Sequence, residues 1–142
     1  MKNVSEKMGI KENCRALFID APTEATDGMD LPKLNISKNK SGEFDYIHLF
    51  VKRQVEYKEI FPKLKSQLKL NGMLWVSWPK GGGLSTDLSL PKVISIGYSF
   101  GLVESTCLSI DYVWSGLKFT HPKKSKVYKN SHADLKGRTT NR

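Results

Sequence analysis

The chain has 142 residues and a formal net charge of +9, with 39% hydrophobic and 26% charged residues. This length suits one domain with a substantial core, and this balance excludes an intrinsically disordered protein. No apolar run is long enough to span a bilayer, and the first lysines are not followed by the apolar stretch of a signal peptide. Cys14 and Cys107 lack C-x-x-C spacing and are expected to be small buried residues. We therefore expect a soluble cytoplasmic protein with reduced thiols, no metal site and no membrane association.

Strand signals are short apolar runs, rich in aromatic and β-branched residues, that end at turn residues. In chain order they predict strands at residues 15–20, 44–51, 73–78, 106–111 and 116–120. Residues 31–37 indicate a further short edge strand, because Pro32 disfavours a central position. The last two strands flank a short connection, which predicts an antiparallel hairpin.

Two helices are expected between these strands. The first has apolar side chains near helical spacing, with lysine and glutamate between them, at positions 55, 60, 64 and 68. Pro62 predicts a kink or a fresh helix start around residue 61, and Asn71-Gly72 is a stop signal. The second helix is expected from residue 87 or 89 to residue 100, ended by Gly101. The segments before and after the first strand, residues 4–13 and 23–30, indicate a short lead-in and a loop with at most one helical turn.

Strands that alternate with helices and end in a hairpin predict an α/β fold. We expect residues 1–120 to form a single domain, a small Rossmann-like three-layer sandwich with a mostly parallel sheet. Residues 121–142 are expected to form a flexible basic tail, whose seven basic side chains are Lys123, Lys124, Lys126, Lys129, Lys136, Arg138 and Arg142. With Asp134 as its one acid, the tail carries +6 and leaves +3 for the rest of the chain. Such a tail can bind nucleic acid or an acidic partner, or it can simply aid solubility.

The segment that follows the strand at residues 73–78 is the first candidate for a functional site. Lys80 comes directly after Pro79, and ligands in open α/β sheets bind where strands end and helices begin. Backbone amides and hydroxyls beside this lysine can form an anion site, and these candidates are Gly81, Gly82, Gly83, Ser85, Thr86 and Asp87. The spacing is not that of a Walker motif. The alternative is a surface lysine beside a flexible turn, with Thr86 or Asp87 capping a helix.

Other candidate side chains come from strand ends and from the tryptophans. Asp20 and Asp111 end predicted strands, where two carboxylates can perform acid–base chemistry or can cap loops. His48 lies inside an apolar strand and is expected to be a hydrogen-bonded core residue. Trp78 and Trp114 can approach the crevice and hold a flat ligand between them, or they can cover the core.

Two sequence blocks are specific enough to compare with known families. Residues 78–80 form a W-P-K block, and residues 114–118 form a W-S-G-L-K block. Together with matching segments between residues 7 and 120, they resemble a family of small bacterial proteins catalogued only as a domain of unknown function. The resemblance adds Lys118 to the candidate ligand-binding residues.

The chain departs from this family pattern at three positions. Members often have a second lysine in place of Gly81, and an acidic residue and a threonine in place of Tyr112 and Val113. More distantly, the order of elements is similar to the second half of class I S-adenosylmethionine methyltransferases, which is a likeness of fold alone. Those enzymes have a glycine-rich loop after the first strand, where residues 19–23 of this chain contain no glycine. The likeness therefore does not imply the usual mode of cofactor binding, and no cofactor is assigned.

These observations predict a non-catalytic binding module. Its ligand is expected to be a small anion or a partner protein, bound in the crevice at the carboxyl ends of the strands. Two alternatives stay open: a degenerate methyltransferase-like enzyme that uses the same crevice, and association with nucleic acid through the basic tail.

Overall fold

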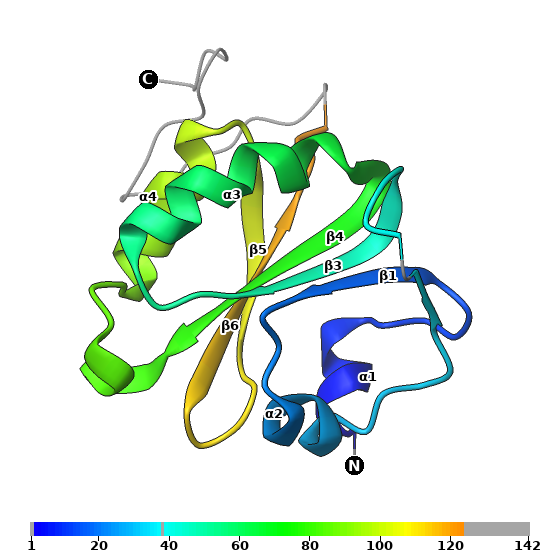
Figure 1. Cartoon of the computed structure of the whole chain (residues 1–142), viewed down its shortest axis with the longest axis horizontal. Coiled ribbons are helices and arrows are strands. Elements are labelled where there is room, and N and C mark those ends of the chain that lie inside the picture. The colour runs from blue at the N-terminus through cyan, green and yellow to red at the C-terminus, as the bar shows by residue number, and fades with distance from the viewer. Residues whose placement is uncertain (1, 38, 124–142) are drawn as a thin grey trace.

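The computed structural model of the chain describes residues 2–37 and 39–123 and centres on a six-stranded sheet (Figure 1). The strands are β1 (Arg15–Ile19), β2 (Asn35–Ile36), β3 (Phe44–Phe50), β4 (Leu68–Pro79), β5 (Val103–Ser109) and β6 (Trp114–Thr120). Their order is β2-β1-β3-β4-β6-β5, with β1 to β4 parallel and β6 antiparallel to both β4 and β5. The predicted Rossmann-like fold, with a mostly parallel sheet and a terminal hairpin, is confirmed. Most of the predicted basic tail, residues 124–142, lies outside the described residues.

Helices cover both faces of the sheet, which gives three layers (Figure 1). They are α1 (Val4–Met8), α2 (Thr23–Gly28), α3 (Gln54–Ser66) and α4 (Leu90–Ser99), with a short 3-10 segment η1 (Lys80–Ser85) after β4. Side chains of α3 and α4 join one apolar cluster with the sheet, and those of α1 and α2 join another. In the described part of the chain, no helix combines the length and the apolar character that crossing a membrane requires.

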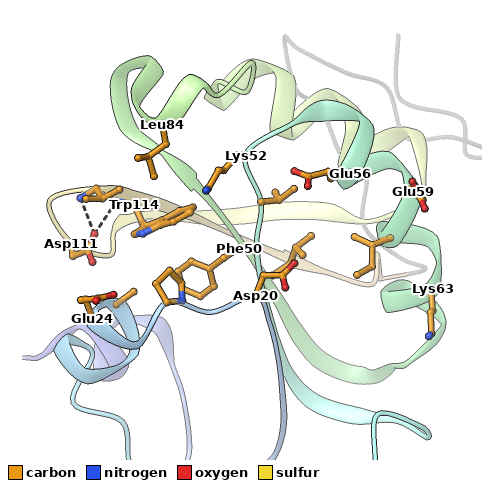
Figure 2. Close-up of a pocket in the computed structure, with 16 residues that line it drawn as sticks. Asp20, Glu24, Phe50, Lys52, Glu56, Glu59, Lys63, Leu84, Asp111 and Trp114 are labelled. Carbon is orange, nitrogen blue, oxygen red and sulfur yellow. Dashed lines mark hydrogen bonds between the residues drawn. The ribbon is translucent and has the colours of Figure 1, made fainter.

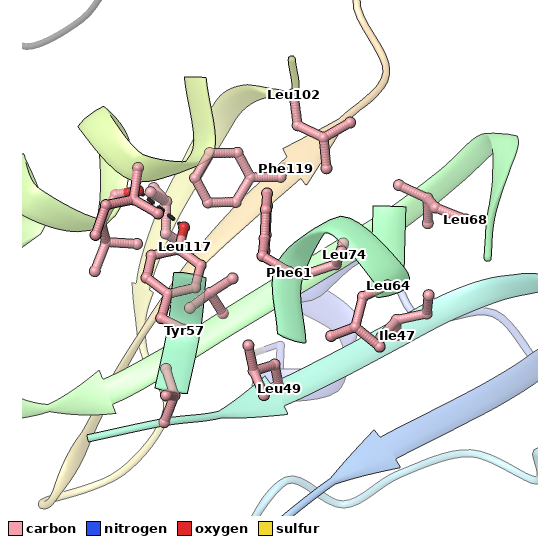
Figure 3. Packing of buried hydrophobic residues seen from close by; sticks show 14 of the residues in the cluster. Ile47, Leu49, Tyr57, Phe61, Leu64, Leu68, Leu74, Leu102, Leu117 and Phe119 are labelled. Atoms are coloured by element: carbon pink, nitrogen blue, oxygen red, sulfur yellow. Dashed lines mark hydrogen bonds between the residues drawn. The ribbon is translucent and has the colours of Figure 1, made fainter. Parts of the chain in front are cut away.

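The larger core lies between the sheet and the two long helices (Figure 3). Phe61 of α3 meets Phe119 of β6 with ring centroids 5.5 Å apart, and Tyr57 donates its phenol hydrogen to the Val93 carbonyl of α4 at 2.9 Å. Strand alternation divides the tryptophans of β4 between the two faces, with Trp78 in this core and Trp75 in the cluster behind the sheet.

Two short helices were missed by the sequence patterns. The lead-in at residues 4–13 contains α1, which begins with a capping box: the Asn3 side chain accepts the Glu6 amide at 2.9 Å, and Glu6 Oε1 accepts the Asn3 amide at 3.0 Å. The segment at residues 23–30, expected to be a loop with at most one turn, contains the six-residue α2. Both helices are too short to show a helical period.

The junction between α3 and β4 also differs from the prediction. α3 is a single helix with Pro62 inside it rather than two helices, and it ends at Ser66, before the expected stop at Asn71-Gly72. β4 starts at Leu68, so this dipeptide lies inside the strand. A Cβ at Gly72 would lie 3.0 Å from the Phe44 carbonyl oxygen of β3, so glycine here permits close strand pairing rather than a turn.

The end of the domain agrees with the predicted order. α4 starts slightly later than expected, and Gly101 adopts φ +91° just after it. β5 and β6 form the expected hairpin, although both strands are longer than the sequence signals. Cys107 on β5 is exposed and Cys14 is half-buried, so the expectation of buried cysteines is wrong for Cys107.

Candidate functional site

The structure places a pocket of about 1080 Å³ at the carboxyl ends of β1 and β3 (Figure 2). The chain leaves β1 toward β2 on one side, whereas β3 continues to β4 on the other side. The carboxyl ends of these two strands therefore flank a topological switch point, where ligands bind in open α/β sheets. Asp20 follows β1 and Lys52 follows β3, and both line the pocket.

The turn after β1 is built without glycine. Asp20 adopts φ +55°, which an aspartate tolerates better than most side chains do. Ala21-Pro22 then leads directly into α2, whose Ala25 is buried and lines the pocket. The turn is therefore tight and acidic, contains no glycine and exposes the Asp20 carboxylate at the pocket.

Carboxylates outnumber amines around the pocket. The acidic lining residues are Asp20, Glu24, Glu56, Glu59 and Asp111, and the basic ones are Lys52 and Lys63. Those on α3 recur at helical spacing, so one exposed face of that helix forms a wall (Figure 2). Five acidic and two basic side chains give the lining a formal charge of −3 although the chain as a whole is basic, so a cation or a neutral molecule suits the pocket better than an anion.

An aromatic wall closes the side of the pocket next to the hairpin. Phe50 and Trp114 both line the pocket and meet edge to face, with centroids 5.1 Å apart and an interplanar angle of 84° (Figure 2). Asp111 Oδ1 accepts the backbone amides of Val113 and Trp114, each at 2.8 Å. This carboxylate thus caps the hairpin turn that carries Trp114, as the loop-capping interpretation of Asp111 predicted, and it also borders the pocket.

The lysine–glycine segment, by contrast, turns away from the pocket. Lys80 Nζ donates to Ser109 Oγ of β5 at 2.5 Å, and within the described residues no hydrogen bond joins it to Asp20, Asp111 or His48. The exposed residues Gly81, Gly82 and Gly83 of η1 do not line the pocket, and neither does Ser85. From this segment, Leu84 is the residue that reaches it (Figure 2).

Asp87 is a capping residue, but of α3 and not of the helix expected, whereas Thr86 bonds the loop on either side without capping a helix. Asp87 Oδ1 accepts the Gln54 amide at 2.7 Å, and its other oxygen lies 3.4 Å from Arg53. Thr86 donates its hydroxyl to the Lys52 carbonyl at 2.5 Å. These contacts fasten the segment before α4 to the start of α3, so they hold the β3–α3 connection beside the pocket.

Two further candidates lie away from the pocket. Trp78 is buried in the cluster under α3 and α4, whereas Trp114 belongs to the cluster on the opposite face of the sheet. A flat ligand therefore cannot lie between these two rings. Lys118 sits on β6 opposite Trp75, and its Nζ is the nearest side-chain atom to the space beside Gly9.

His48 is a hydrogen-bonded core residue, as predicted. Its ring is fully buried, with Nδ1 2.6 Å from the Tyr46 hydroxyl and Nε2 2.7 Å from Ser77 Oγ. Burial lowers the pKa of His48 to about 3, so the imidazole is neutral at physiological pH. Among the described residues, no group of three or more histidine, cysteine or acidic side chains is arranged to hold a metal ion.

The sequence reasoning missed the lining residues of the β3–α3 region. Phe50 and Lys52 lie at the end of a strand that was predicted correctly, so the strand-end rule that selected Asp20 applies to them equally. Glu56 and Glu59 fall on the polar face of a predicted helix. Their spacing shows that they share a face, but it does not show that this face borders a cavity.

No protein-family model matches the chain, and no curated protein matches its sequence. Solved structures do match its fold. A TehB-like SAM-dependent methyltransferase from Corynebacterium glutamicum superposes with a TM-score of 0.56 at 10% identity, over 82% of this chain and 85% of that one. A ribosomal protein L11 methylase from Lactobacillus delbrueckii gives 0.54 at 12% identity, over 82% and 74%. The fibrillarin pre-rRNA processing protein of Methanococcus jannaschii gives 0.51 at 14% identity, over 80% and 69%.

The chain has a methyltransferase-like fold. The expected similarity to class I methyltransferases is confirmed at this level, and it extends beyond the second half of those proteins because most of each matched chain is covered. At 10–14% identity the likeness concerns the fold and not the reaction.

Proposed function

We propose that this methyltransferase-like protein binds a small cationic or zwitterionic ligand of the S-adenosyl class in the pocket at the ends of β1 and β3. One observation carries the proposal: an acidic pocket with an aromatic wall lies at the switch point of a methyltransferase-like sheet. A sulfonium or ammonium group suits the carboxylates, and an aromatic face attracts a cation by about 0.5–2 kcal/mol. A volume of about 1080 Å³ is ample for a nucleoside of this size.

This proposal favours the methyltransferase-like alternative over the anion-binding module predicted from the sequence. The groups chosen for anion binding, Lys80 and the glycines after it, do not line the pocket, and the lysine is occupied by Ser109. We assign a binding role to this pocket and name no catalytic residue. The ligand is expected to bind without the usual glycine-rich loop, using the acidic turn at Asp20 instead.

We also propose that the chain belongs with the small bacterial family its W-P-K and W-S-G-L-K blocks resemble. These blocks pair with each other across the sheet: Trp78 lies opposite Ser115, and Pro79 lies opposite Trp114. The Lys80 amide also donates to the Val113 carbonyl at 2.7 Å. Support for a shared family therefore comes from two blocks that form one structural unit, whose role in the pocket is to place Trp114.

The test is titration calorimetry with S-adenosylmethionine and with S-adenosylhomocysteine, which lacks the sulfonium charge but keeps the ammonium and carboxylate groups. Glu56→Gln/Glu59→Gln removes two pocket carboxylates, and Glu12→Gln/Glu43→Gln makes the same charge change at exposed sites away from the pocket. Exposed charge pairs contribute below about 1 kcal/mol each, so we expect the pocket pair to weaken binding of the cation about two- to tenfold. The control pair and Lys80→Ala should leave it unchanged.

Thermal unfolding gives a second readout of the same binding. A ligand at about one hundred times its dissociation constant adds about 2.7 kcal/mol to the stability of the folded state. If neither S-adenosyl compound binds or stabilises the wild type, the proposal fails. Equal losses in the pocket pair and the control pair would show that overall charge, and not the pocket, governs binding.

A further inference from the structure

A chain of buried polar groups lies on one face of the sheet, directly behind the aromatic wall of the pocket. The Tyr46 hydroxyl lies 2.6 Å from His48 Nδ1, and His48 Nε2 lies 2.7 Å from Ser77 Oγ on the neighbouring strand. All three side chains are fully buried. A neutral imidazole donates from one nitrogen and accepts at the other, so both edges of the His48 ring are held and the plane of the ring is fixed.

The face of this fixed ring supports the pocket wall. His48 stacks on Phe50 with centroids 4.3 Å apart and an interplanar angle of 16°. Phe50 in turn meets Trp114 edge to face at 5.1 Å, and both of these rings line the pocket. An unbroken series of contacts therefore joins the hydrogen-bonded core to the surface that a ligand would touch.

Stability alone does not explain a polar residue at this position. Apolar side chains of similar size pack in a core without needing partners, whereas a buried polar network stabilises only when every member is satisfied. Among the described residues no buried side-chain nitrogen or oxygen lacks a partner, so this network is complete. When every polar group in a network has a partner, the hydrogen bonds fix the orientation of its side chains. An apolar contact restricts orientation much less.

We infer that His48 is a positioning residue for the pocket: Tyr46 and Ser77 hold its ring, and the ring sets the orientation of Phe50 and Trp114. The consequence for ligand affinity rests on the proposed function. The positioning itself does not, because it concerns the protein without ligand.

The test uses protein labelled with 5-fluorotryptophan, whose fluorine resonances report the surroundings of each tryptophan. The Trp114 signal is assigned as the one that Trp114→Phe removes. Tyr46→Phe deletes one hydroxyl of the network and Ser77→Ala deletes the other, so one variant serves if the other fails to fold. Tyr57→Phe is the matched control, because it removes an equally buried phenol hydroxyl that bonds Val93 on the far side of the sheet.

We expect Tyr46→Phe and Ser77→Ala to shift or broaden the Trp114 resonance without ligand, and Tyr57→Phe to leave it in place. With S-adenosylmethionine, the two network variants should bind about three- to tenfold more weakly than the control. An unchanged Trp114 signal in both network variants would overturn the inference, and so would an equal change in Tyr57→Phe. If the wild type binds no S-adenosyl compound, the proposed function fails, while the fluorine signal still decides the positioning role.

Discussion

The buried histidine makes stability depend on pH in a way that can be calculated. Burial lowers the pKa of His48 to about 3 in the folded protein, against 6.5 for an exposed imidazole. As the pH falls below 6.5, the unfolded chain therefore takes up a proton that the folded protein excludes, and the free energy of unfolding decreases. The contribution of the neutral, buried His48 to the free energy of unfolding is fully present above pH 6.5 and is lost progressively toward pH 3. Linkage gives a loss of about 2 kcal/mol at pH 5 and about 4 kcal/mol at pH 3.

The assay is urea unfolding at pH 8, 7, 6 and 5 at constant ionic strength, for the wild type and His48→Gln. The variant is expected to be less stable at pH 8 because it disturbs the network, but it has no imidazole to protonate. The stability gap between the two proteins should therefore shrink by about 2 kcal/mol between pH 8 and pH 5. Ser77→Ala keeps the histidine buried, so its deficit should stay constant. A gap that does not change with pH for His48→Gln would refute the reasoning.

Three further perturbations test packing, capping and the tail. Gly97→Ala should destabilise the protein by about 1–3 kcal/mol, because the new Cβ would lie 2.2 Å from a ring carbon of Phe119. In the same thermal melts Gly28→Ala, whose Cβ meets nothing within 4 Å, should be neutral or slightly stabilising, and equal losses would contradict this account. Asp87→Ala should cost about 1 kcal/mol by uncapping α3, with Asp87→Asn retaining most of the stability; a neutral alanine variant would show that the cap is unimportant. A chain ending at Thr120 should lose any affinity for nucleic acid in salt-dependent filter binding, and undiminished binding would exclude the tail.

The sheet could be predicted because its central strands are apolar runs that end at turn residues. β1, β3 and the β5–β6 hairpin follow from such runs, and the order of strands and helices indicates the layers. The start of β4 could not be predicted, because the dipeptide Asn71-Gly72 suits two different places. It can end a helix, or it can lie inside a strand where the glycine makes room for the carbonyl of a neighbouring strand. The choice between these roles depends on Phe44, which comes 28 residues earlier in the chain and pairs with Leu68.

The candidate site was predicted in part for a related reason. The strand-end rule locates the edge of the sheet where ligands bind, and Asp20, Asp111 and Trp114 do line the pocket there. The rule does not say which way a side chain turns after its strand ends. Lys80 turns toward Ser109 on the hairpin, and this contact depends on the antiparallel pairing of β6 with both β4 and β5.

The net charge of the chain does not describe the pocket, because charge is distributed unevenly along the chain. Most of the excess of basic residues falls after residue 120, whereas acidic side chains outnumber basic ones around the pocket and come from the turn after β1, from α2, from α3 and from the hairpin. A ligand responds to the potential within about a Debye length, roughly 8–10 Å, and not to the total charge of the chain. The W-P-K and W-S-G-L-K blocks show a similar contrast between their basic residues and the residues that line the pocket. Their lysines do not line the pocket, but the pairing of Pro79 with Trp114 places an aromatic ring there. The chemistry that a ligand meets is therefore acidic and aromatic, and the choice of probes should follow from that.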